Sequence, residues 1–199
     1  MSIYSSRLIG VLVIVTLFFV SFPAKADDGV LPSEVFTAIM LKALNYDRNL
    51  ERLAKEKVVI GVVSSSDDAP AQGFSTQVKD NIDKVQSTFL LKGKPVDVNV
   101  FSLEKVFDKA KFEEQLKQAN VSVLIVAAQD LTFVNNVTEV TKNLQLSSIC
   151  GAPGCAQRGI GLEIVQKDNR PHMSINLNSA KLEGSDYDSK LLAMCDVVK

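Results

Sequence analysis

The sequence contains few of the residues from which enzyme and metal sites are built. Its 199 residues include one histidine, three cysteines and no tryptophan. No serine lies between glycines as in a hydrolase nucleophile elbow, and no glycine-rich loop with a lysine is present to cradle a phosphate. The histidine, His172, has no cysteine or paired carboxylate at metal-ligand spacing. We therefore expect no catalytic centre, cofactor or metal site; turnover that depends on His172 or Asp67 is the least favoured alternative.

The sequence also lacks an excess of either charge. It has 22 lysines and arginines against 23 aspartates and glutamates, and 46% of its residues are hydrophobic. This composition is typical of a globular protein and excludes a disordered polyampholyte or a basic nucleic-acid arm. Because a balanced surface does not attract polyanions strongly, we expect no nucleic acid as the main ligand.

The one long apolar run lies at the N-terminus. Arg7 precedes an apolar stretch at residues 8–20, and Ala24-Lys25-Ala26 has the small-x-small pattern that signal peptidase recognises. As a helix the stretch would reach about 20 Å, short of the roughly 30 Å hydrocarbon core of a membrane. We therefore predict an exported protein with a signal peptide at residues 1–26, cleavage after Ala26, and a single domain at residues 27–199. An uncleaved anchor is the alternative.

Export changes how the cysteines are interpreted. In an oxidising compartment Cys150 and Cys155 are expected to form a disulfide that closes a turn-rich loop with two glycines and a proline. A redox-active pair is the alternative, although thioredoxin-like chemistry uses two intervening residues and this pair has four. Cys195 lies in an apolar stretch of a predicted terminal helix, where a buried free thiol is expected.

Hydrophobic periodicity predicts an α/β fold. Apolar residues at helical spacing predict one long helix over residues 33–55, and the continuous run at residues 58–63 predicts a strand covered on both faces. Later patterns predict a helix through Val78, Ile82, Val85 and Phe89, a strand at 96–101, a helix at 109–119, a strand at 121–127, a helix through Phe133, Val137, Val140 and Leu144, and a short strand at 147–149. This alternation indicates a three-layer fold, a mostly parallel sheet with helices on both faces.

The end of the chain departs from this alternation. Residues 159–166 and 171–177 read as two strands joined by a polar turn, which predicts an antiparallel hairpin. Ser185 or Asp186 could then cap a closing helix that extends through Leu191, Leu192 and Val197.

Two loops at the ends of predicted parallel strands are candidate binding sites. Doubly wound folds place ligands at the carboxyl ends of their strands. The polar side chains predicted there are Ser64, Ser65, Ser66, Asp67, Gln129 and Asp130. Ordinary solvated loops are the alternative.

The last third of the chain contains a recognisable combination of residues. A glycine-led strand precedes a strand that ends in Ile-Asn-Leu, followed by an Ala-Lys-x-x-Gly step and a leucine pair. The residues of this pattern are Gly159, Gly161, Ile175, Asn176, Leu177, Ala180, Gly184, Leu191 and Leu192. The combination resembles the ending of the YfiR-like family of bacterial periplasmic proteins, which often has a cysteine-bounded loop just before it.

The resemblance implies a regulatory binding protein and not an enzyme. In that family a periplasmic protein restrains the sensing domain of an inner-membrane diguanylate cyclase and lowers cyclic di-GMP output. It therefore implies a periplasmic location and an inner-membrane sensor as partner, and it leaves a homodimer open. One departure is visible, because many members have an aromatic-Trp-Pro step where this chain has Tyr46-Asp47-Arg48-Asn49. A single-lobe periplasmic small-molecule binding protein is the alternative function.

Overall fold

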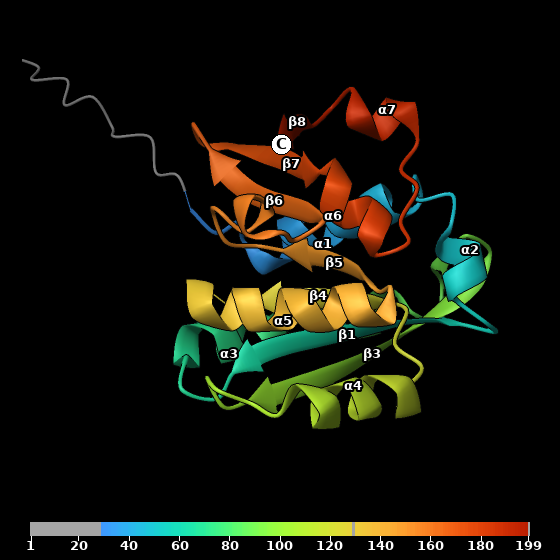
Figure 1. Cartoon of the computed structure of the whole chain (residues 1–199). Helices are drawn as coiled ribbons and strands as arrows, with labels where there is room; N and C mark the ends of the chain where they lie inside the picture. Colours follow the sequence, from blue (N-terminus) through green and yellow to red (C-terminus); the bar gives the residue numbers. More distant parts are fainter. Residues whose placement is uncertain (1–28, 129, 199) are drawn as a thin grey trace, which may run out of the picture.

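The computed structural model describes residues 29–128 and 130–198 (Figure 1). The predicted signal peptide and its cleavage site fall on residues 1–26, outside the described residues. None of the helices among the described residues combines the length and the apolar character needed to cross a membrane.

The strands form one twisted sheet. Their bounds are β1 Val58–Ser65, β2 Leu90–Leu91, β3 Lys94–Leu103, β4 Val123–Ala127, β5 Ser147–Cys150, β6 Leu162–Lys167, β7 Arg170–Asn176 and β8 Asp196–Val198. The eight strands lie in the order β2-β3-β1-β4-β5-β6-β7-β8. Neighbours from β3 to β6 are parallel, β7 is antiparallel to β6, and β8 is parallel to β7. The predicted mostly parallel sheet and C-terminal hairpin are confirmed.

Helices cover both faces of the sheet. The long ones are α1 Ser33–Leu44, α3 Ala69–Val85, α4 Lys109–Gln118 and α5 Leu131–Leu144; the short ones are α2 Leu50–Leu53, the 3-10 turn Ala156–Arg158, α6 Leu177–Leu182 and α7 Ser189–Leu192. One apolar core joins α1 and α3 to the sheet, and a second joins α4 and α5 to the opposite face. Consecutive residues of β1, such as Val62 and Val63, enter different cores. Both faces of β1 are therefore buried, which explains its continuous apolar run.

The first helix is shorter than the sequence predicts. It ends at Leu44, and α2 follows a turn instead of continuing the same helix. The cause is Asp47, whose buried carboxylate accepts hydrogen bonds from the N–H groups of Asn49 at 2.9 Å and Asp186 at 3.0 Å. Because these bonds fix the chain in a turn, the apolar periodicity continues through a break in the helix.

The closing helix is also shorter than predicted. It is α7, which is capped by Asp188 and not by Ser185 or Asp186, and Val197 lies in β8 opposite Ile175. The Ser185 hydroxyl is 2.6 Å from that of Ser147, so it is not available as a cap. The preceding strand ends at Asn176, one residue earlier than expected, because the Asn176 side chain accepts a hydrogen bond from the Ser179 N–H and caps α6.

The connections place a crevice at one end of the sheet. After β1 the chain crosses the α1 face through α3 to reach β3, and then crosses the other face through α4 to reach β4 on the opposite side of β1. The loops that leave β1 and β4 therefore diverge to opposite faces. Doubly wound folds bind ligands at this kind of switch point, outside the carboxyl ends of the strands.

Candidate functional site

A cavity of about 410 Å³ lies at the carboxyl ends of the strands beside this switch point. We call it the carboxyl-end pocket. It is formed by the beginning of α3, the end of β4, the residues after β5 and the segment before α1. Its lining residues are Val30, Pro70, Ala71, Gly73, Phe74, Gln77, Val126, Ala127, Ala128, Gly151 and Ala152. All but Gln77 lack a polar side chain, so the pocket suits an apolar group more than a charged one.

The first turn of α3 gives a second reason to expect an apolar group and not an anion in this pocket. The Asp68 carboxylate accepts a hydrogen bond from the Ala71 N–H at 3.0 Å, and the Asp68 carbonyl accepts one from Gln72 at 2.9 Å. A helix N-terminus can bind anions through its free N–H groups and its positive dipole end. Here a carboxylate of the chain itself already occupies that position, so an external anion would meet a like charge.

Close packing of aromatic rings joins the pocket wall to the core. Phe74 meets Phe36 edge to face, with ring centroids 5.2 Å apart. A Cβ atom at Gly151 would lie 3.2 Å from an atom of each ring, so glycine allows the chain after β5 to approach the aromatic pair. Residue 151 thereby places the cysteine-bounded loop against α3.

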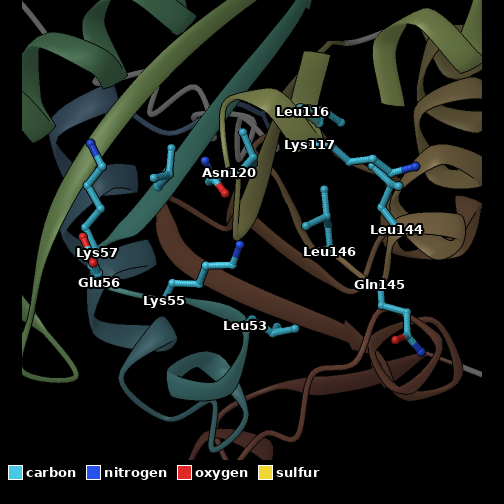
Figure 2. A pocket seen from close by; sticks show the side chains of 12 residues that line it. Leu53, Lys55, Glu56, Lys57, Leu116, Lys117, Asn120, Leu144, Gln145 and Leu146 are labelled. Carbon is cyan, nitrogen blue, oxygen red and sulfur yellow. The ribbon is translucent and has the colours of Figure 1, made fainter. Parts of the chain in front are cut away.

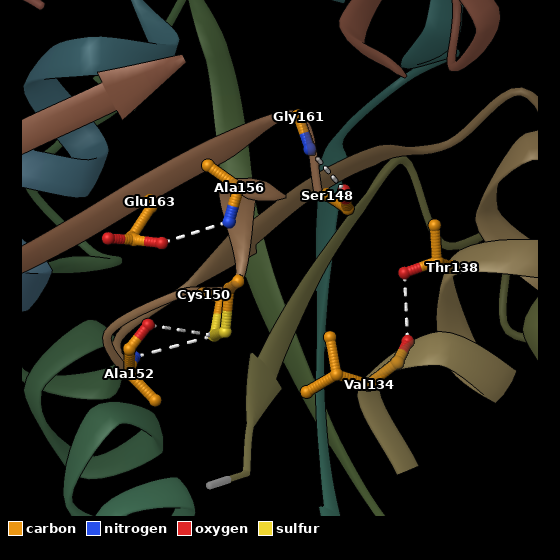
Figure 3. The surroundings of a disulfide bond; sticks show 9 residues. Val134, Thr138, Ser148, Cys150, Ala152, Ala156, Gly161 and Glu163 are labelled. Atoms are coloured by element: carbon orange, nitrogen blue, oxygen red, sulfur yellow. Dashed lines mark hydrogen bonds between the residues drawn. A yellow bond between two sulfur atoms is a disulfide. The ribbon is translucent and has the colours of Figure 1, made fainter. Parts of the chain in front are cut away.

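The predicted disulfide between Cys150 and Cys155 is present and closes this loop (Figure 3). Two side chains of the β6–β7 hairpin, Glu163 and Asn176, hold the loop by hydrogen bonds. Glu163 Oε2 accepts a hydrogen bond from the Ala156 N–H at 2.9 Å, and Asn176 Nδ2 donates one to the Ala156 carbonyl at 2.9 Å. Burial raises the pKa of Glu163, while loop N–H groups that face its carboxylate oppose the shift. The loop is thus a fixed wall of the pocket.

Of the residues predicted to form a loop after β1, Ser64 and Ser65 are the last residues of the strand, and Ser66 and Asp67 form the turn that follows. The Ser66 N–H donates to the Leu103 carbonyl at 2.6 Å, and the Asp67 N–H donates to Ser65 Oγ at 3.4 Å. Ser64 is only 1% exposed, and its hydroxyl has no hydrogen-bond partner among the described residues. Ser64 pairs in register with Ala127, which lines the pocket. Of these four side chains, Ser64 is therefore the one beside the pocket wall.

The second predicted loop is partly described. Gln129 lies outside the described residues. Asp130 caps α5 by accepting hydrogen bonds from the N–H groups of Thr132 and Phe133, at 2.9 and 3.0 Å. The Lys105 ammonium, 2.6 Å from Asp130, lowers the pKa of that carboxyl. Asp130 therefore has a structural role that the sequence did not reveal.

The residues of the C-terminal pattern support the fold beneath the pocket. Gly159 and Gly184 have φ angles of 94° and 79°, which favour glycine. Ile175, Ala180 and Leu191 are buried, and Leu192 packs against the same core. Leu177, expected to end a strand, instead begins α6 after the Asn176 cap.

Sequence reasoning missed the carboxyl group of Glu183. It is completely buried and accepts hydrogen bonds from the Ser148 N–H at 3.0 Å, the Ser148 hydroxyl at 2.6 Å and the Thr141 hydroxyl at 2.7 Å. Burial raises the pKa of Glu183 to about 7, against the opposing effect of these bonds. A Cβ atom at Gly161 would lie 2.6 Å from Glu183 Oε2, so the glycine of the pattern makes room for this carboxyl. In the sequence, the one sign of this buried carboxyl was the acidic residue within the Ala-Lys-Leu-Glu-Gly step at residues 180–184.

The remaining chemical candidates also have defined environments. Among residues 29–128 and 130–198, no group of three or more histidine, cysteine, aspartate or glutamate side chains is placed to hold a metal ion. His172 Nε2 lies 3.0 Å from Asp196 and joins β7 to β8. Cys195 is a free thiol, half-buried in a bend after α7, and burial raises its pKa to about 11.

Comparison with known families gives one match that spans most of the chain. Residues 33–195 match the family model DUF4154, described as YfiR/HmsC-like. No curated protein sequence matches this chain.

Several solved structures share the fold. A conserved domain protein from Vibrio cholerae O1 biovar eltor is 13% identical with a TM-score of 0.55, and the match covers 84% of this chain and 60% of that one. A substrate-binding protein with adhesive properties from Clostridium difficile, in its ligand-free open form, is 13% identical with a TM-score of 0.50 and coverages of 76% and 57%. An ABC domain from Streptococcus pneumonia in complex with L-Trp is 12% identical with a TM-score of 0.51 and coverages of 78% and 60%. The matches span about three fifths of each of these longer chains, and at this identity they establish the fold alone.

Proposed function

The chain belongs to the YfiR/HmsC-like family of periplasmic regulatory proteins, and from that premise we propose that it represses a membrane-bound sensor of the diguanylate cyclase type. The observation that carries the proposal is the family match over residues 33–195. The surface proposed to contact the sensor's periplasmic domain is the carboxyl-end pocket and its rim, including the turn that contains Asp67 and the loop that contains Asp130.

The apolar lining and the fixed shape of the carboxyl-end pocket support its role as the contact surface. Val30, on the pocket rim, is 37% exposed, and the rest of the lining offers an apolar recess for a side chain of a partner. The disulfide-bounded loop and the Phe36–Phe74 pair keep that recess in one shape, which lowers the ordering cost of binding. Protein interfaces gain most of their affinity from a few such buried anchor contacts.

Repression then follows from differential affinity. A protein that binds the inactive form of a sensor more tightly than the active form shifts the sensor toward inactivity. At saturation the equilibrium constant between the active and inactive forms changes by the ratio of the two affinities. No chemical step is required.

The test uses a charge placed on the pocket rim. Deleting the gene should raise cellular cyclic di-GMP, and the unmodified gene should restore the low level. Val30→Asp should fail to restore it, because a carboxylate would have to be desolvated against an apolar partner surface. Val197→Asp is the matched control, since Val197 is 49% exposed but lies on β8 at the far edge of the sheet. An unchanged cyclic di-GMP level after deletion would contradict the proposed function.

The N-terminal processing forms part of the same proposal. We propose that residues 1–26 direct export and are removed after Ala26, leaving residues 27–199 as one domain in the periplasm. N-terminal sequencing of the protein purified from the periplasmic fraction should begin at Asp27. A chain that begins at Met1 in the cytoplasmic fraction would contradict this.

A small-molecule binding role is the second candidate. A cavity of about 410 Å³ at a switch point lies within the usual size range of ligand sites, roughly 300 to 1,000 Å³. In a thermal-shift screen, saturable stabilisation by a metabolite would favour this role. Gly73→Leu provides the control, because a Cβ atom at Gly73 has no neighbour within 4 Å and the leucine would extend into the cavity. A stabilisation that persists in Gly73→Leu would place the ligand elsewhere.

A further inference from the structure

A second cavity lies at the opposite end of the sheet. Its volume is about 540 Å³, and it opens where β1 begins and where α4 and α5 end (Figure 2). We call it the amino-end pocket. None of the predicted binding residues and none of the C-terminal pattern residues lines it. The amino-end pocket therefore lies outside the surface proposed to contact the sensor.

The apolar floor of this pocket comes from the ends of two neighbouring helices. Asn120 after α4 and Gln145 after α5 have left-handed φ angles of 52° and 54°. In each case the next residue returns its N–H to a carbonyl five residues earlier, Val121 to Leu116 at 3.0 Å and Leu146 to Thr141 at 2.9 Å. This is the Schellman arrangement, which turns the apolar residue after the left-handed one back against the helix.

These bonds also determine the charge that a ligand would meet. A helix C-terminus normally presents unpaired carbonyl groups and a partial negative charge. Here main-chain N–H groups occupy carbonyls at the ends of both helices. The opposition that an anion would otherwise meet is therefore reduced, and the charged side chains of the rim decide the sign of the site.

The rim has an excess of positive charge. Lys55 and Lys117 are exposed, and neither ammonium is within ion-pair distance of a carboxylate among the described residues. Lys57 differs, because it pairs with Asp97 and points away from Lys55 in Figure 2. Glu56 is the one acidic residue of the lining. Figure 2 shows Lys55 extending toward the middle of the pocket, whereas Lys117 lies on the opposite side and its ammonium points away from Lys55.

The backbone that positions Lys55 is fixed. The Lys94 ammonium donates hydrogen bonds to the carbonyl oxygens of Glu51 at 3.0 Å and Lys55 at 2.7 Å, and also to that of Ala54. These bonds anchor the segment between α2 and β1 against β3. The wall of the pocket therefore exists before any ligand arrives, which favours binding.

We propose that the amino-end pocket binds a medium-chain fatty acid or a similar amphiphile with a single carboxylate, its apolar chain against the half-buried Leu53 and Leu144 and its carboxylate at the Lys55 ammonium, with Lys117 adding positive charge to the rim. Apolar surface and unpaired ammonium groups are the two features that such a ligand needs together. An ammonium and a carboxylate form a charge-assisted hydrogen bond, which is stronger than one between neutral groups. The cavity volume lies within the range of small-molecule sites.

The test compares two amphiphiles of equal chain length. Decanoate and decyltrimethylammonium are titrated calorimetrically into the purified protein, each below its micelle concentration. We expect decanoate to bind saturably at one site per chain and at least about tenfold more tightly than the cation. The double variant Lys55→Gln, Lys117→Gln should weaken decanoate binding by about tenfold or more. Lys111→Gln, on the same helix as Lys117 but outside the pocket lining, is the control and should leave binding unchanged.

A second variant tests the apolar part of the site. Leu53 lines the pocket and is only half-buried, so Leu53→Gln should weaken decanoate binding without unfolding the protein. Thermal unfolding of each variant reports whether it is folded. The proposal is overturned if decanoate does not bind, if both amphiphiles bind equally, or if the double lysine variant binds decanoate as tightly as the unmodified protein.

Discussion

At the scale of single residues, Glu183 has the most consequential environment that the sequence left unnoticed. Its carboxyl group connects β5 to α5 through Ser148 and Thr141, and the Ser148 hydroxyl also accepts a hydrogen bond from the Gly161 N–H at 2.9 Å. A buried carboxyl group prefers to be protonated, because ionisation would place an uncompensated charge in the core. Its pKa of about 7 in the folded protein therefore stands above the ordinary value of 4.5.

This shift gives the stability of the protein a defined pH dependence. The raised pKa means that the folded state holds the Glu183 proton more tightly than the unfolded state does. Its contribution to stability is therefore complete below about pH 4.5 and is lost as pH rises through about 7. We expect the free energy of unfolding to fall by about 3 kcal/mol from this group alone across that interval. Urea titrations at several pH values measure it.

Glu183→Gln should remove this dependence. A glutamine can accept the Ser148 N–H through its amide oxygen and donate its two amide hydrogens to the hydroxyls of Ser148 and Thr141, whereas the protonated acid has a single hydrogen to donate. Between pH 5 and 8 the free energy of unfolding of the Glu183→Gln variant should not show the fall that titration of Glu183 causes in the unmodified protein. Glu104→Gln, an exposed carboxyl on the loop after β3, should keep the dependence of the unmodified protein. Equal slopes in both variants would contradict the assignment.

At the scale of elements, the cysteine-bounded loop shows how a short segment is held by chemistry of two kinds. The disulfide closes it covalently, while Glu163 and Asn176 hold Ala156 by hydrogen bonds. These contacts come from β6 and from the end of β7, so the hairpin supports the loop. The loop in turn forms part of the wall of the carboxyl-end pocket.

Removing the disulfide should destabilise the protein moderately. For the double variant Cys150→Ser, Cys155→Ser we expect the free energy of unfolding to fall by about 2 kcal/mol, because so short a loop restricts the unfolded chain only slightly. The fold should persist, since the hydrogen bonds of Glu163 and Asn176 remain. Thermal and urea unfolding measure the loss. A variant that does not fold would show that the disulfide does more than close the loop.

The elements also show what the sequence could reveal. Residues 58–63 predicted a buried strand because they form a continuous apolar run, residues 121–127 did so with Ser122 as their one polar residue, and cysteine spacing predicted the disulfide. The break after α1 was missed because it depends on Asp47 accepting an N–H from Asp186, a contact between residues far apart in the chain. The lining of the carboxyl-end pocket was missed because alanines and valines that line a pocket cannot be told from core residues in the sequence.

At the scale of the whole molecule, the two helical layers leave the sheet unevenly protected. β1 and β4 are central and covered on both faces, whereas β8 is a short edge strand with an exposed Val197. Hydrogen exchange from such an edge requires only local opening, while exchange from the centre requires most of the domain to unfold.

We therefore expect a gradient of amide hydrogen exchange across the sheet. Amides of Val62 and Ile125, in β1 and β4, should exchange slowest, at rates set by global unfolding. The amides of the two edge strands, β2 and β8, should exchange fastest among the strands. Exchange measured by mass spectrometry or NMR at a pH where the protein is most stable would show this order. Equal protection of β8 and β4 would contradict it.

The segment that contains β4 runs from one cavity to the other. Val121 lines the amino-end pocket, and Val126, five residues further along the chain, lines the carboxyl-end pocket. If occupation of one end displaces this segment along its own axis, the other end must respond. Thermodynamic reciprocity then requires that a molecule in either place alter the affinity of the other by one common factor, so a single measured ratio would describe communication in both directions.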